Sequence, residues 1–172
     1  NQPYLGPTGS HYGGDIQQSA LFGATRLNPM DDLAVILGSR VANWKEREFT
    51  QANSQAERQY KVKTNEKNVW VPYAGVVVDL TDQLSTYVGY TEIFNPQTNQ
   101  DASCSALPPT VGASYETGLK AEFYGGALNA RAALFRIEQD NFAVAIPGAV
   151  TPSGGQAYRA ASGTTSEGFE IE

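Results

Sequence analysis

Hydrophobic and polar residues alternate along several segments of this chain, in the way expected of β-strands with one apolar side. The clearest case runs from Tyr115 to Phe123, where one side carries no charge and the other carries Glu116, Lys120 and Glu122. Successive side chains of a strand point to opposite faces, so the segment predicts a strand with one apolar and one charged face.

Short turns and long polar stretches alternate between the predicted strands. Turns are expected at 28–32, 81–83 and 124–127, and long loops at 49–68, 95–112 and 140–165. Nothing in a soluble β-sandwich enforces this asymmetry, whereas transmembrane β-barrels have short periplasmic turns and longer external loops. The pattern predicts an all-β fold: an antiparallel, up-and-down segment of a transmembrane β-barrel with about seven strands.

The cost of placing charge in lipid assigns the two faces. A Lys or Arg side chain on the lipid side at mid-bilayer costs roughly 2–4 kcal/mol, so charged positions are expected to face a wet lumen. The residues expected in the lumen wall are Arg40, Glu116, Lys120, Glu122 and Glu170. The solvated face of a soluble β-sandwich explains a single strand equally well. Segment 128–138 has charges on both sides, with Arg131 on one and Arg136 on the other, so its orientation stays open.

Composition and charge exclude two classes of protein. The chain has 172 residues with 41% hydrophobic residues, and no run approaches the ~20 apolar residues that a spanning helix needs. A net charge of −6 argues against a nucleic-acid partner.

The sequence contains few residues that could form a disulfide, a metal site or a catalytic site. Cys104 is the only cysteine, so it cannot form an internal disulfide, and no spacing of Cys and His indicates a metal site. The one histidine, His11, lies in a Gly-rich segment and is expected to be solvated. No set of Ser, His and Asp and no phosphate-binding loop is found, so catalysis is the least favoured class of function.

Several longer motifs resemble a known family. They are Tyr-Ala-Gly-Val-Val-Val-Asp-Leu-Thr-Asp at 73–82, Ser-Thr-Tyr-Val-Gly-Tyr-Thr-Glu-Ile-Phe-Asn-Pro-Gln at 85–97 and Leu-Pro-Pro-Thr-Val-Gly-Ala-Ser-Tyr-Glu-Thr-Gly-Leu-Lys at 107–120. In order and spacing they resemble the barrel of TonB-dependent siderophore receptors, over about residues 17–172. Within that family they most resemble receptors for hydroxamate-type siderophores, such as those for ferric coprogen, ferrioxamine and pyoverdine.

The resemblance implies an outer-membrane protein with a barrel of about 22 strands and an N-terminal plug. The plug, the TonB box and the signal peptide have no counterpart in residues 1–172, so the whole chain is expected to be an internal piece from the later part of one barrel domain. Its sheet is expected to be open, with unpaired edges. The implied partners are a ferric siderophore, outer-membrane lipid, and the TonB–ExbB–ExbD complex acting through the missing plug and TonB box. The siderophore would carry the iron, so no cofactor and no metal ligand of the chain is expected.

Aromatic and amide side chains near the external mouth are the candidates for ligand contact. By topology these are Trp44, Tyr60, Trp70, Phe94 and Gln97. Aromatic residues at strand ends often form an interfacial girdle instead, and this alternative is favoured for Trp70 and Tyr73. A general outer-membrane porin and a soluble β-sandwich binding module remain the alternative functions.

Overall fold

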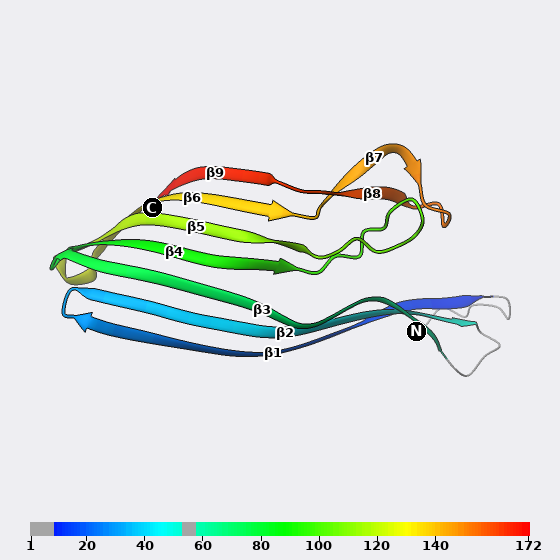
Figure 1. Cartoon of the computed structure of the whole chain (residues 1–172), viewed down its shortest axis with the longest axis horizontal. Coiled ribbons are helices and arrows are strands. Elements are labelled where there is room, and N and C mark those ends of the chain that lie inside the picture. The colour runs from blue at the N-terminus through cyan, green and yellow to red at the C-terminus, as the bar shows by residue number, and fades with distance from the viewer. Residues whose placement is uncertain (1–8, 53–57) are drawn as a thin grey trace.

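The computed structural model describes residues 9–52 and 58–172, and its main body is one antiparallel sheet of seven strands in the order β1-β2-β3-β4-β5-β6-β9 (Figure 1). β1 and β9 lie at opposite edges and do not pair with each other, so the sheet is open as predicted. A second sheet contains β7 and β8. The elements are β1 (Ser10–Met30), β2 (Leu33–Ala52), β3 (Gln59–Thr81), β4 (Leu84–Asn95), β5 (Thr110–Phe123), η1 (Tyr124–Gly126), β6 (Leu128–Asp140), β7 (Phe142–Val150), β8 (Gln156–Ala161) and β9 (Thr164–Ile171).

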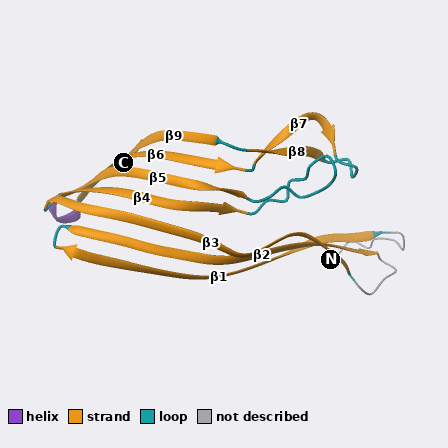
Figure 2. Cartoon of the chain, in the orientation of Figure 1, coloured by secondary structure: helices purple, strands orange, loops and turns teal. Residues whose placement is uncertain are grey.

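The short connections all lie at one end of the sheet and the long ones at the other (Figure 2). Two-residue turns at 31–32 and 82–83 join β1 to β2 and β3 to β4, and η1 joins β5 to β6. Within η1, Tyr124 and Gly125 have φ angles of 54° and 64°, and glycine adopts this left-handed conformation at little cost. The predicted alternation of turns and loops is confirmed.

Two predicted loops contain more strand than expected. β2 continues to Ala52 and β3 begins at Gln59, so most of 49–68 is a hairpin arm, and 140–165 contains β7 and β8. The arm has polar residues on both sides. Ion pairs join the strands beside it, with Arg47–Asp15 between β2 and β1 at 3.7 Å and Lys63–Glu48 between β3 and β2 at 2.9 Å. The alternation of hydrophobicity could not identify these strands because water can solvate both faces there.

Strand register divides the main sheet into an apolar face and a polar face. Residues paired directly across a ladder share a face, so Val76, Val88, Thr117, Leu134 and Phe169 form one row. The neighbouring rows on this face, called the apolar face below, contain Leu33, Val35, Leu37, Val41, Val78, Ala74, Trp70, Leu84, Thr86, Leu119, Ala132 and Ile171. The opposite face, called the polar face, includes Arg40, Val71, Tyr87, Gly118 and Ala133.

The main sheet has no core of large side chains. Its buried apolar residues are small or on the polar face, namely Ala34, Ala42, Val71 and Ala133, and none of the larger side chains of the described residues is fully buried. Leu134 and Phe169 are instead 62% and 73% exposed. A β-sandwich would bury such residues between two sheets, so this single layer contradicts the sandwich alternative.

Among residues 9–52 and 58–172 no helix is long and apolar enough to cross a membrane.

The loop between β4 and β5 packs against the β7–β8 hairpin. The amide of Tyr158 donates to the carbonyl of Gln100 at 2.8 Å, and Asn141 Nδ2 donates to the carbonyl of Pro109 at 3.0 Å. Leu107 and Ala157 are buried in this region. The two long connections therefore form one folded unit at the loop end of the sheet.

Candidate functional site

A cluster of charged and aromatic side chains lies on the polar face across β4, β5 and β6. Glu116 on β5 accepts hydrogen bonds from the Tyr87 hydroxyl on β4 and from the Arg131 guanidinium on β6. Arg131 Nε also donates to the Tyr87 hydroxyl at 3.1 Å, and the Lys120 ammonium lies 4.8 Å from the Tyr87 ring centroid. Three adjacent strands are thus joined by one hydrogen-bonded network, in which the Glu116 and Arg131 side chains are about one-third exposed.

The Tyr87 ring lies over Gly118, its direct partner on β5. A Cβ atom added at Gly118 would come within 2.9 Å of the ring and 2.4 Å of the Ala132 carbonyl oxygen. The same arrangement recurs on this face, where Tyr73 lies over Gly38 and Phe135 over Gly168. Because glycine has no side chain, it leaves room for the aromatic ring of the residue opposite it on the neighbouring strand.

Register places all five predicted wall residues on the polar face. Glu116, Lys120 and Glu122 alternate along β5, Arg40 pairs with Val71, and Glu170 pairs with Ala133. Lys120 also pairs with Arg131, which settles the orientation of β6 that the sequence left open. That orientation puts Arg136 on the apolar face, where it forms ion pairs with Glu138 at 2.7 Å and Glu167 at 3.2 Å.

The sequence analysis missed Tyr87 and did not place Arg131. Tyr87 lies in a strand whose two sides carry similar residues, so the alternation of odd and even positions did not indicate the face on which its side chain lies. Its place in the network follows from its pairing with Gly118. Only the cross-strand register could have identified it.

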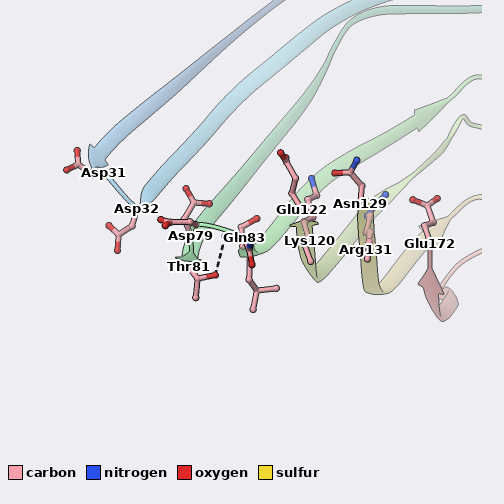
Figure 3. A pocket seen from close by; sticks show the side chains of 15 residues that line it. Asp31, Asp32, Asp79, Thr81, Gln83, Lys120, Glu122, Asn129, Arg131 and Glu172 are labelled. Carbon is pink, nitrogen blue, oxygen red and sulfur yellow. Dashed lines mark hydrogen bonds between the residues drawn. The ribbon is translucent and has the colours of Figure 1, made fainter. Parts of the chain in front are cut away.

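The polar face is hollowed at the turn end of the sheet (Figure 3). A cavity of about 710 Å³ is lined there by the turns, by the last residues of β3 and β5, and by the first residues of β4 and β6. Its acidic lining residues outnumber the basic ones, which are Lys120 and Arg131; the acidic residues are Asp31, Asp32, Asp79, Asp82, Glu122 and Glu172. No group of three or more His, Cys, Asp or Glu side chains in the described part of the chain could hold a metal ion.

Trp44 is the one aromatic ligand candidate on the polar face. It follows Arg40 and Ala42 on the same side of β2, beyond the apolar rows and toward the loop end. Its indole Nε1 is shielded from solvent and has no hydrogen-bond partner among the described residues. A buried donor without a partner is uncommon in folded proteins and marks Trp44 for a mutational test.

The other aromatic candidates lie on the opposite side. Trp70 pairs with Val41 and is 64% exposed, and Phe94 pairs with Val111, so both belong to the apolar face near its loop end. This position is typical of an interfacial girdle. Tyr60 lies farther out on the same side, 5.8 Å from the ring of Phe49 and 4.9 Å from the guanidinium of Arg47.

Gln97 ties the loops together. Its Nε2 donates to the carbonyl of Pro108 and, at 2.8 Å, to the carbonyl of Asn141, while its Oε1 accepts from Asn99 Nδ2 at 3.3 Å. Both ends of the amide are therefore used within the loop unit.

Asp101 holds the tip of the β4–β5 loop. Its Oδ1 accepts hydrogen bonds from the Ser103 hydroxyl at 2.7 Å, the Ser103 amide at 2.8 Å and the Ser105 amide at 2.9 Å. These bonds, that of the Ser103 hydroxyl first, lower the pKa of Asp101 below its ordinary value. Hydrogen bonding to Ser153 likewise lowers the pKa of the Cys104 thiol.

We expect the loop tip to loosen in acid. A carboxyl whose folded pKa is depressed contributes stability that is present above its ordinary pKa and lost as the pH falls through the lowered value. A nitroxide attached to Cys104 should become more mobile below about pH 4, the ordinary range of an aspartate. In the Asp101→Asn variant, the nitroxide should already be as mobile at neutral pH as it is in the native chain in acid, and its mobility should not change when the pH is lowered. A spectrum that changes with pH in that variant as it does in the native chain would exclude Asp101 as the cause.

Comparison with known proteins agrees with this architecture. The family model described as "TonB dependent receptor-like, beta-barrel" matches residues 1–172. The ferric-pyoverdine 358 receptor of Pseudomonas putida is 41% identical over 165 residues, which are 95% of this chain and 20% of that protein. The ferripyoverdine receptor of Pseudomonas aeruginosa is 33% identical over 142 residues, or 81% of this chain and 16% of that protein.

Solved structures show the same fold. The alcaligin outer-membrane receptor of Bordetella pertussis superimposes with a TM-score of 0.71 at 37% identity, over 94% of this chain and 27% of that one. The ferripyoverdine receptor of P. aeruginosa bound to ferripyoverdine gives 0.75 at 29% identity, over 92% of this chain and 20% of that one. The chain thus spans about a fifth of the length of its first curated relatives. It belongs to the TonB-dependent receptor β-barrel family, whose members are outer-membrane receptors and transporters and not enzymes.

Proposed function

We propose that the protein containing this chain is an outer-membrane receptor that takes up ferric siderophores, with pyoverdine-type chelates as the first candidates. The observation that carries the proposal is the match of nearly the whole chain to two ferric-pyoverdine receptors, at 41% and 40% identity. Uptake is energy-coupled through TonB, with ExbB and ExbD, as the family name implies for TonB. The siderophore supplies the ligands of its own iron, so iron enters as cargo.

The two faces of the sheet suit this role. The apolar face contacts outer-membrane lipid, and the polar face lines the lumen. Tyr115 to Phe123 spans about 27 Å at ~3.4 Å per residue, and a strand tilt of about 40° reduces this to roughly 21 Å across the membrane. This height is close to the ~25 Å apolar band of outer-membrane barrels.

The loop end of the sheet faces the outside of the cell. Longer loops are external and short turns periplasmic in barrels of this kind. The charged network at Tyr87, Glu116, Lys120 and Arg131 then belongs to the lumen wall and extends to the acidic hollow at the turn end, which Lys120 and Arg131 line. Arg40, Glu122 and Glu170 complete this wall in the proposal.

Growth under iron limitation tests the function. The complete gene is expressed in a strain that lacks siderophore synthesis and its own receptors, and ferric pyoverdine, coprogen, ferrioxamine and alcaligin are supplied singly. We expect growth and uptake of radioactive iron with at least one chelate, abolished by deletion of TonB. Absence of uptake with every chelate, while the receptor is present in the outer membrane, would refute the assignment.

The two tryptophans give a matched test of the binding site. Because Trp44 is on the polar face and its Nε1 has no partner among residues 9–52 and 58–172, Trp44→Ala should weaken binding of the accepted chelate roughly tenfold, or ~1.4 kcal/mol. Trp70→Ala should leave affinity unchanged, because Trp70 is on the apolar face. Affinity is measured by quenching of pyoverdine fluorescence or by ligand titration. Equal losses in both variants would remove Trp44 from the site.

A further inference from the structure

We propose that the apolar face contains a fixed binding groove for one acyl chain of a membrane lipid, across β4, β5, β6 and β9. The inference rests on the proposed lipid contact of this face and adds a defined site to it. Two adjoining hollows of about 410 and 400 Å³ form the groove, and they share Thr117 and Leu134.

Side-chain size on neighbouring strands creates the hollow. Thr86 and Ala132 flank Leu119 in one register row, and Val88 and Leu134 flank Thr117 in the next. The small residues Thr117 and Ala132 are therefore diagonal neighbours at the floor, between the taller side chains Leu119 and Leu134. The outer wall of the groove is formed by Phe169 and Ile171, which are 73% and 77% exposed.

The hydroxyl groups at the groove floor already donate to the backbone. The Thr86 hydroxyl donates to the carbonyl of Gly118 at 3.0 Å, and the Thr117 hydroxyl donates to the carbonyl of Tyr87 at 2.9 Å. Polar side chains also line the two hollows, namely Tyr115, Glu116, Arg136, Glu167 and Glu170. At the floor itself a hydrocarbon chain needs no polar partner.

Packing, and not the hydrophobic effect, selects the occupant. A lipid chain leaves one apolar environment for another when it enters the groove, so only closer contact with the walls favours the bound state. A thin, flexible acyl chain can follow a diagonal hollow that rigid side chains cannot fill.

The loop-side end of the groove is charged, which orients the lipid. Arg136 and Glu167 line that end, and Arg136 is paired with both Glu167 and Glu138. Polar groups of the lipid can bond to this cluster while its chain lies toward Leu119 and Ile171. The lipid is thereby placed in the leaflet on the loop side.

Native mass spectrometry of the complete receptor tests the groove. Receptor in mild detergent is mixed with palmitoyl-oleoyl phosphatidylethanolamine or, in a second arm, with palmitate, and bound copies are counted after detergent removal. Ala132→Phe fills the floor and should retain one lipid fewer than the native protein in the first arm. Retention of palmitate as well would show that the chain alone is sufficient.

Ala130→Phe is the matched control, since Ala130 is on the same face of the same strand and lines neither hollow. Thr117→Leu is a second filling variant, should Ala132→Phe fail to assemble. Equal lipid counts in the native protein and both filling variants would overturn the groove but not transport. Loss of one lipid in the Ala130→Phe control as well would show that the loss is not specific to the groove and would also overturn it. A native receptor that retains no lipid at all would instead contradict lipid contact by this face.

Discussion

Val76→Arg is expected to lower the free energy of unfolding of the receptor by roughly 2–4 kcal/mol, the cost of a cationic side chain near the middle of the lipid face of a barrel. Val76 is on the apolar face, in the row that joins Val88, Thr117 and Leu134, and is 39% exposed. An arginine side chain at this position must extend along the strand past several residues before its guanidinium reaches water. Urea unfolding in lipid vesicles, followed by heat-modifiable electrophoretic mobility, measures the change.

Val77→Arg provides the control at nearly the same depth. Val77 is the next residue of β3 and pairs with Tyr87 on the polar face, where an arginine can be solvated and can lie near an aromatic ring. We expect a loss of no more than about 1 kcal/mol. If both arginines destabilise equally, the two faces are not lipid and lumen, and the proposed membrane orientation is wrong.

Gly118→Ala should destabilise the barrel by about 1–3 kcal/mol, although only one methyl group is added. The new Cβ would come within 2.4 Å of the Ala132 carbonyl oxygen and 2.9 Å of the Tyr87 ring. The backbone of β6 cannot yield without losing ladder hydrogen bonds, and displacement of Tyr87 would break its bonds to Glu116 and Arg131. Loss of these bonds adds to the steric cost.

Gly89→Ala is the comparison for this effect. Gly89 is on β4 and, like Gly118, belongs to the polar face. The nearest atom to a Cβ added at Gly89 is the Glu116 carbonyl oxygen at 4.0 Å. Replacement of a strand glycine without a clash should be neutral or stabilising by about 0.4–1 kcal/mol, because the unfolded chain loses freedom. Both variants are assayed by the same unfolding measurement. Equal stability of the two would mean that the close approach at Gly118 has no energetic effect.

Much of the architecture could be predicted from the sequence because lipid imposes a simple rule on it. A charged side chain on the apolar face has an energetic cost. The charged residues Glu116, Lys120 and Glu122 therefore indicate which face of β5 lies away from lipid. The seven strands and the placement of turns and loops at opposite ends were predicted from the spacing of turn residues and polar stretches, and the open sheet from the resemblance to part of a larger barrel. The hairpin arm and the β7–β8 hairpin were not, since strands in water on both sides carry no such signal.

The candidate site was less predictable than the fold. Trp44, Tyr60, Trp70 and Phe94 were chosen by their distance along the strands, and distance does not determine the side on which a residue lies. The structure separates Trp44 from the other three by register. Gln97 was predicted as a ligand contact from its place near the mouth, but its hydrogen bonds to Pro108 and Asn141 could not be predicted, because these partners are distant in the sequence.

The sequence by itself determined the class of fold and the apolar face, since these depend on residue type and on period-two spacing within single strands. It also indicated the family, through the resemblance of the motifs at 73–82, 85–97 and 107–120. Only the tertiary structure decided the Tyr87–Glu116–Arg131 network, the orientation of β6 and the groove at Thr117 and Ala132. Each of these depends on which residues of different strands lie opposite one another. Register of this kind is a property of the assembled ladder, and a shift of one residue would reverse the face of every side chain on a strand.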